Sequence, residues 1–464
     1  MDNVKFTIGG GLSADHLEHV HRTALRVLDD VGVEITNPVI LQRIAGLAGV
    51  RTQGTRVRLA PELVDRLVEE HRRSLSPPVP SDEFFLEILP GYCFHVLDPL
   101  TDRLRPMQTS DCIDLARLVD GLYVQGVRGG TPGLPQDVPP ALREVLAYKI
   151  SLEHTRSPGW PGISSLPTGE AAIRMAEVTG QQIGLSIFVL DPLLIEGPTV
   201  DMAVKFLDRR APIQLSISTM PMAGATTPIQ LPAAFVESAA TNLGAFTVFK
   251  LLGTDIGITP LVFTFDMKYG TISMGNPEHV QAWLMADQLF AFYNNGRSHW
   301  LCPSFHTNAV FPDAHSMTTR AAFAAIGALR GARHFGFTGL LGIDKIFSPE
   351  QLILDIEIVR YLQHLVRPIE FTDKTLGYDI LKEVGPRGDF LMHPTTVEAC
   401  HSFWTSPIFH NQSSEQAAGR TPAAMRESIR EIIRKAEAAH DFNLDPAAVR
   451  ELDNIYRRYA STVT

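Results

Sequence analysis

The side chains best suited to chemistry follow short β-rich runs of the sequence. Asp266 ends a run of Phe and Val, and His306 and Asn308 lie two residues apart after another such run. If these runs are parallel strands, their carboxyl ends share one face, and the three side chains become candidate catalytic groups. The alternative for Asp266 is a structural role in capping its own loop. Neither HExxH nor GxSxG occurs in the sequence, so no hydrolytic motif accompanies them.

Four loops near these residues are rich in Met, aromatic and small residues. They span 220–227, 266–275, 304–311 and 339–345. Met fills irregular apolar surfaces and Gly lets backbone approach a ligand closely, so the loops are typical of a soft mouth for a bulky, mostly apolar cofactor. The alternative is ordinary core filling. The candidate cofactor contacts are Met220, Met222, Gly224, Thr226, Asp313, Gly339, Leu340 and Gly342.

The elements that must position these loops alternate between strand and helix. From about residue 121 we expect strands near 122–125, 159–164, 186–190, 213–219, 259–265, 299–303, 334–338 and 389–393. Eight such units predict an α/β protein, a (β/α)8 TIM barrel, over 121–405. An open doubly wound sheet is the alternative, but no GxGxxG follows the first predicted strand.

Helix start signals support this alternation. Asn276-Pro277, Ser348-Pro349 and Thr227-Pro228 each place a capping side chain or first-turn proline before an apolar run. Residues 1–120 read as an N-terminal cap, with helices over 14–31 and 61–71 and a hairpin joining 92–97 to 104–107. Residues 406–464 read as a tail that ends in two polar helices beginning near Pro422 and Pro446.

Composition excludes several classes of protein. With 464 residues, 45% of them hydrophobic, the chain can bury a large core. A net charge of -10 and the lack of a basic run argue against nucleic acid, and no segment is apolar enough to predict a membrane span. The four dispersed cysteines have no metal-ligand spacing, so we expect a cytoplasmic protein without a protein-ligated metal. We also expect a homo-oligomer.

The sequence resembles the trimethylamine methyltransferase family. The run STMPMAGATTP at 218–228, followed by an apolar helix, is similar to the family's signature stretch, and 135–139, 154–158, 266–268, 308–314, 383–386 and 390–395 agree further. The resemblance implies a barrel that binds a methyl donor and receives a corrinoid (cobalamin), carried by a partner corrinoid protein or bound as the free methyl acceptor. Only standard residues occur, so it implies the branch without pyrrolysine, which includes glycine betaine methyltransferases.

A quaternary nitrogen already carries its positive charge and leaves as a neutral amine, so methyl transfer from it needs no general acid. Aromatic faces hold such a cation without overstabilising the ground state. The predicted substrate contacts are Tyr269, Trp300, Phe305, Phe337, Glu237 and His393, and a betaine carboxylate could meet His306, Asn308 or His393. The alternatives are a non-catalytic corrinoid- or betaine-binding barrel and a barrel lyase or hydrolase.

Overall fold

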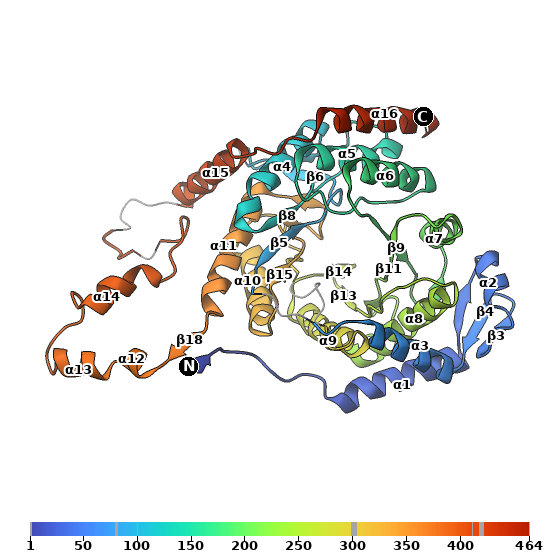
Figure 1. Ribbon diagram of the computed structural model, residues 1–464, viewed down its shortest axis with the longest axis horizontal. Helices are drawn as coiled ribbons and strands as arrows, with labels where there is room; N and C mark the ends of the chain where they lie inside the picture. Colours follow the sequence, from blue (N-terminus) through green and yellow to red (C-terminus); the bar gives the residue numbers. More distant parts are fainter. Residues whose placement is uncertain are drawn as a thin grey trace.

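The computed structural model describes residues 2–78, 82–99, 101–297, 304–410, 412–416 and 422–463. It is a mixed α/β structure in which short strands lie inside a ring of helices (Figure 1). The strands β5 (Phe85–Ile88), β8 (Val127–Gly129), β9 (Gly184–Phe188), β11 (Gln214–Ser218), β13 (Phe263–Asp266) and β15 (His334–Phe335) belong to this inner set. The predicted α/β class is therefore confirmed.

The inner strands pair in parallel wherever two of them meet. β15 pairs with β5 and β5 with β8, so one ladder joins an early segment of the chain to a late one. β11 pairs with β9 over five residues, β12 (Met222–Ala223) pairs with β13, and an isolated parallel bridge joins Ser304 to Gly336. These are separate ladders among the described residues.

The helices outside the strands begin where local capping predicts. They are α4 (Thr109–Gly121), α5 (Arg143–His154), α6 (Leu166–Thr179), α7 (Pro198–Arg209), α8 (Leu231–Leu251), α9 (Pro277–Tyr293), α10 (Ala314–Leu329) and α11 (Pro349–Leu365). Asn276 and Ser348 cap α9 and α11 with their side chains, as expected, because each accepts a backbone N–H of the first turn. The helix expected from Thr227-Pro228 begins only at Leu231, because residues 222–227 close a tight turn.

Three predicted strands are wrong. Residues 123–125 form a 3-10 helix, and the strand follows Gly126, whose φ of 88° ends that helix. No strand occurs at 389–393; His393 caps the short helix α14 (Pro394–Ala399) and is far from the inner strands (Figure 1). The segment 159–164 also forms no ladder, and the predicted strand 299–303 lies outside the described residues.

The N-terminal segment packs against the ring. Helix α1 (Ala14–Asp30) lies on α8, and β10 (Leu194–Ile195), β2 (Val33–Ile35), β4 (Arg56–Leu59) and β3 (Val50–Gln53) form one sheet in that order. Helices α2 (Pro38–Ile44) and α3 (Pro61–Ser74) complete this part. The expected helices 14–31 and 61–71 are confirmed.

The expected hairpin is also present. β6 (His95–Leu97) pairs antiparallel with β7 (Leu104–Pro106). This hairpin follows β5 and joins β17 (Ile346–Phe347) and β16 (Leu340–Leu341) in a second four-stranded sheet. The hairpin therefore places residues that follow β5, the first inner strand, beside residues that follow β15, the last one.

The C-terminal part leaves the ring and returns. After α11, β18 (Ile369–Phe371) pairs with β1 (Asp2–Val4), and α12 (Asp373–Leu376), α13 (Tyr378–Val384) and α14 extend away from the body in Figure 1. The chain then returns to form α15 (Pro422–Ala438) and α16 (Pro446–Val463), the two expected terminal helices. In the described part of the chain, no helix combines the length and apolar character that crossing a membrane requires.

Candidate active site

Three neighbouring segments present polar and aromatic side chains at their carboxyl ends. The bridge at Ser304 joins β15 at Gly336, and β15 pairs with β5. His306 follows the first of these segments, Phe337 the second and Tyr92 the third. Because the pairing is parallel, all three residues lie at the same end of the strands.

The centre of this group is a buried pair of His306 and Asp344. The His306 Nδ1 atom lies 2.7 Å from Asp344 Oδ2, and the two side chains are 2% and 3% exposed. The ring of His306 packs on Phe337, with 3.7 Å between ring centroids. The loop 336–345 therefore supplies both a charge partner and an aromatic face to one histidine.

That loop has an unusual backbone. Phe337, Ile343 and Asp344 have φ values of 59°, 57° and 61°, the left-handed region that side chains other than Gly disfavour. Such conformations cost about 1–3 kcal/mol each and persist only where surrounding contacts impose them. Here Gly342 N–H donates to the Ala309 carbonyl at 2.8 Å and Ile343 N–H to the Thr307 carbonyl at 3.0 Å. These backbone contacts hold the loop in the conformation that places the Asp344 carboxylate against His306.

A second histidine, His279, lies beside the first. Its ring centroid is 5.8 Å from that of His306, and Phe263, Trp283 and Phe323 surround it. Burial, and then the nearby His306, hold its pKa well below the ordinary value, so His279 is neutral. Its Nδ1 accepts the Gly275 N–H at 3.0 Å, which places the proton on Nε2. Neither histidine has a hydrogen-bond partner for Nε2 among the described residues.

Tyr92 adds a further aromatic face. Its ring meets Phe337 edge-on, with 5.9 Å between centroids. Burial, and then the charge of Asp344, raise the pKa of Tyr92 to about 12, so its phenol stays neutral. The two rings thus form an uncharged aromatic pair next to a buried carboxylate.

Other predicted polar residues hold the loops in place. Asn308 Oδ1 accepts the Met274 N–H at 2.5 Å, and its Nδ2 donates to the Ile272 carbonyl at 3.0 Å, so both ends of the amide are occupied. Asp266 accepts the N–H groups of Lys268 and Tyr269 within its own turn. Asp313 caps α10 with a capping box. Asn308, Asp266 and Asp313 therefore have structural roles in holding loops and capping a helix.

The predicted aromatic and loop residues divide by exposure. Phe305 is buried against Phe335, with Arg320 over its ring, and Leu340 is also buried. Tyr269 and Met220 are exposed at the surface, at 71% and 48%.

The predicted cofactor contacts in the loops have structural roles. Met222, Gly224 and Thr226 form a turn in which the Thr226 hydroxyl accepts the Met222 N–H. Gly339 N–H donates to the buried Asp355, and Gly342 has a φ of 57°. Trp300 lies outside the described residues.

Two predicted substrate residues are not brought to the His306 centre. His393 lies on the outlying segment, where its Nε2 is 3.7 Å from Glu383. Glu237 lies in α8, where it accepts the Thr241 hydroxyl at 2.7 Å. Asp191 lies close to Glu237, in the loop after β9. Burial, and then the charge of Glu237, raise the pKa of Asp191 to about 7.

Asp344, His279 and Tyr92 were missed from the sequence. Asp344 is the carboxylate of a loop that we identified for its glycines, and its position in the Gly342-Ile-Asp-Lys345 run was the available signal. His279 follows the Asn276-Pro277 helix start, where a capping pattern explains the residues without invoking chemistry. Tyr92 belonged to a hairpin that was assigned to the N-terminal cap.

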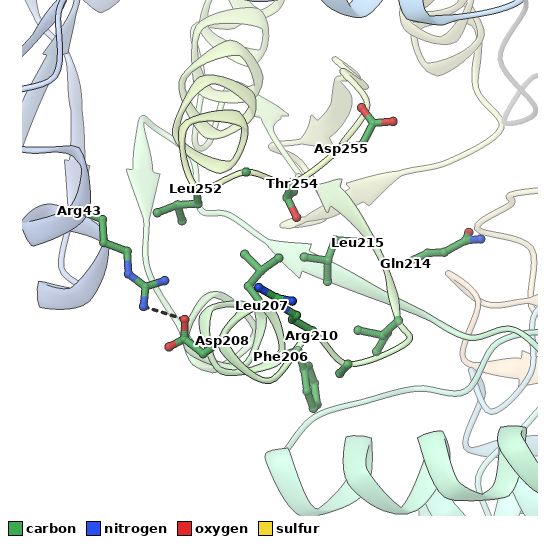
Figure 2. A pocket seen from close by; sticks show the side chains of 13 residues that line it. Arg43, Phe206, Leu207, Asp208, Arg210, Gln214, Leu215, Leu252, Thr254 and Asp255 are labelled. Atoms are coloured by element: carbon green, nitrogen blue, oxygen red, sulfur yellow. Dashed lines mark hydrogen bonds and ion pairs between the residues drawn. The ribbon is translucent and has the colours of Figure 1, made fainter.

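A cavity lies at the end of the strands opposite to His306. This cavity, of about 850 Å³, is lined by the ends of α7 and α8 and by Gln214, the first residue of β11 (Figure 2). Its Arg43 pairs with Asp208 at 2.6 Å, as Figure 2 shows. The carboxyl ends that carry His306 face away from it. Within the described residues, no group of three His, Cys, Asp or Glu side chains could hold a metal ion.

The family profile described as trimethylamine methyltransferase matches residues 5–462. The chain therefore belongs to the trimethylamine methyltransferase family, and the predicted family is confirmed.

Curated relatives agree with this assignment. The chain is 22% identical over 430 residues to a glycine betaine methyltransferase of Desulfitobacterium hafniense strain Y51, covering 87% of each chain. It is 25% identical over 407 residues to a trimethylamine methyltransferase of Desulfitobacterium hafniense strain DCB-2, covering 83% of this chain and 81% of that one. Among solved structures, the monomethylamine methyltransferase of Methanosarcina barkeri matches with a TM-score of 0.43 and 8% identity, over 98% and 88% of the chains.

Proposed function

We propose that this methyltransferase moves a methyl group from a quaternary amine, a betaine or a related compound, to the cobalt of a corrinoid that a partner protein carries. The observation that supports this proposal is the aromatic pair Tyr92–Phe337 next to the buried pair Asp344–His306. Aromatic faces with a carboxylate behind them suit a permanently charged, apolar head group. The relative named glycine betaine methyltransferase supports the same class of donor.

The arrangement also suits the direction of charge flow. Positive charge leaves the donor nitrogen as its methyl group is transferred, so an unshielded carboxylate in contact with nitrogen would stabilise the substrate more than the transition state. Asp344 is instead 2.7 Å from His306, and Phe337 packs on that histidine. We propose that the donor meets the two aromatic rings, each worth about 0.5–2 kcal/mol as a cation-π contact.

The leaving group is a neutral amine, so the chain needs to hold the donor and exclude water rather than deliver a proton. The corrinoid supplies the reduced cobalt nucleophile, and this chain positions the methyl carbon in line with it. For a betaine, we propose that the His279 Nε2–H and His306 receive the carboxylate. Of the three residues predicted to meet the carboxylate, Asn308 is occupied by backbone and His393 lies elsewhere, which leaves His306; His279 lies beside it, and its Nε2 has no partner among the described residues.

The surface around this centre fits a corrinoid acceptor. Large apolar side chains are exposed at or after the ends of four successive inner segments. They are Phe188 at the end of β9 and Leu190 after it, Met220 after β11, Met267 and Tyr269 after β13, and Phe311 after Ser304. A mouth with this apolar rim could accept a large planar cofactor together with the surface of its carrier.

We further propose that the separate parallel ladders are segments of one (β/α)8 barrel. Its first strand would be β5 and its last β15, because β15 pairs with β5. This numbering would move the start of the barrel from residue 121 to the beginning of β5.

The deciding experiment incubates the chain with cob(I)alamin, or a corrinoid protein, and a panel of glycine betaine, proline betaine, carnitine and choline. We expect methylcobalamin, followed by its absorption spectrum, with at least one donor and release of the corresponding tertiary amine. Donor binding without methylcobalamin would favour the non-catalytic alternative. Donor consumption without cobalt methylation would favour a lyase or hydrolase.

A further inference from the structure

The segment 363–405, here called the arm, has no core of its own. Every residue between the buried Leu362 and the buried Ser406 is at least partly exposed. The arm is held at both ends, because Ser406 donates to Glu357 of α11 at 2.5 Å and Trp404 packs on Tyr361. Between these points it extends away from the ring of helices in Figure 1.

The arm is nevertheless built from regular structure. Helices α12, α13 and α14 have 4, 7 and 6 residues, and Thr372 closes a capping box at the start of α12. Isolated helices shorter than roughly 12–15 residues are marginal in water. The β1–β18 pair is a two-stranded sheet, which is also marginal by itself. Local structure of this kind needs packing that the described parts of the same chain do not supply.

The exposed side chains of the arm are strongly apolar. Eleven large ones are exposed by 40% to 79%: Leu365, Ile369, Phe371, Leu376, Tyr378, Leu381, Phe390, Leu391, Met392, Val397 and Phe403. A fully exposed aromatic side chain can bury roughly 150–250 Å² and an aliphatic one less, so with their exposed fractions these eleven side chains leave on the order of 1,000 Å² to be covered. A standard interface buries about 800 Å² per partner, so the arm alone meets that requirement.

We propose that the arm is the contact surface for a second copy of this chain. Exposed apolar surface of this extent marks a contact site, and a copy of the same chain is always present in equal amount. The arm holds six acidic and four basic residues, so it lacks the positive charge that would hold it on an anionic membrane. Neither β1 nor β18 has a second strand partner among the described residues, so each leaves a free edge to such a copy.

The test compares the full chain with the double variant Leu391→Glu/Met392→Glu by sedimentation velocity over a dilution series. These side chains are 75% and 79% exposed, so the substitutions should not disturb the fold of one copy. We expect the wild-type chain to sediment as a dimer or larger assembly, and the variant to show a dissociation constant at least tenfold higher. Val124→Glu, at a site 87% exposed and outside the arm, is the matched control and should behave as wild type.

Hydrogen exchange of the arm amides provides a second readout. We expect protection that is lost as the wild-type chain is diluted, together with loss of the assembly. A wild-type chain that is monomeric at micromolar concentration overturns the proposal, as does a variant with an unchanged dissociation constant. Protection that appears only with a corrinoid protein or with lipid vesicles also overturns it. The outcome does not depend on methyl transfer, so it is separate from the proposed function.

Discussion

At the scale of single residues, Asp191 links stability to pH. Burial, and then Glu237, raise its pKa to about 7, against about 3.9 in an unfolded chain. The folded state therefore holds this proton more tightly, and the contribution to stability present at pH 4 is lost as the pH rises toward 7. Asp191→Asn removes the titrating carboxyl group and with it this loss of stability at higher pH. The Asn side chain can still accept the Met220 N–H.

We therefore expect Asp191→Asn to raise the melting temperature by a few degrees at pH 8 and to have a smaller effect at pH 5, measured by calorimetry. Glu237→Gln, which removes the neighbouring charge, should weaken the pH dependence of the wild-type chain. A difference between wild type and Asp191→Asn that is equal at both pH values would contradict the raised pKa.

Asp344 offers a second test at this scale. Asn tolerates a left-handed φ such as the 61° of Asp344, so Asp344→Asn removes the charge with little change of backbone. We expect the dissociation constant for a quaternary amine to rise about tenfold, equivalent to about 1.4 kcal/mol, by calorimetric titration. Binding of the isosteric carbon analogue, which has carbon in place of the charged nitrogen, should not change. Equal losses for both ligands would show that Asp344 acts on shape alone.

At the scale of elements, side chains of α10 and α11 hold the loop 336–345 in place. Arg320 and Asp355 are fully buried and 2.6 Å apart; Arg320 donates to the Leu340 carbonyl, and Asp355 accepts the Gly339 N–H. Asp355→Ala leaves a buried arginine without its partner, so we expect a loss of about 3–5 kcal/mol in the free energy of unfolding. Denaturant unfolding measures this loss. Arg320→Met/Asp355→Leu should recover much of the stability but not the methyl-transfer activity, because Gly339 is still released.

Helix boundaries were predictable from sequence because capping is local. Asn276 and Ser348 start α9 and α11 as expected, since a side chain and a backbone N–H three residues apart decide the start. Strand identity depends on partners elsewhere in the chain. Residues 122–125 and 389–393 have suitable composition, but the strand β5 at 85–88 is the one that meets both β8 and β15. No local pattern distinguishes these cases.

At the scale of the whole molecule, the site was only partly predictable. The sequence predicted a loop with His306 and named Phe337 as a substrate contact, because strand ends mark one face of parallel α/β structure. The pairing of His306 with Asp344 was not predicted, since it depends on three left-handed residues and on backbone contacts from 307–309 to 342–343. Phe305 was assigned to the substrate, but its ring is buried in the core against Phe335, whereas the next residue, His306, contacts Asp344.

The last prediction concerns the exposed apolar side chains that we propose as the docking surface for the corrinoid protein. They lie apart from the His306 centre, to which we assign the methyl donor. Met267 and Tyr269 are 69% and 71% exposed and lie in the loop after β13. Replacing both with Asp would force carboxylates into an apolar interface, so we expect the KM for a corrinoid protein to rise at least tenfold. Quaternary amine binding should be unchanged, and transfer to free cob(I)alamin should largely remain. Val124→Asp, at the other end of the strands, is the control. An unchanged KM for the corrinoid protein would exclude this rim as the surface on which the acceptor docks.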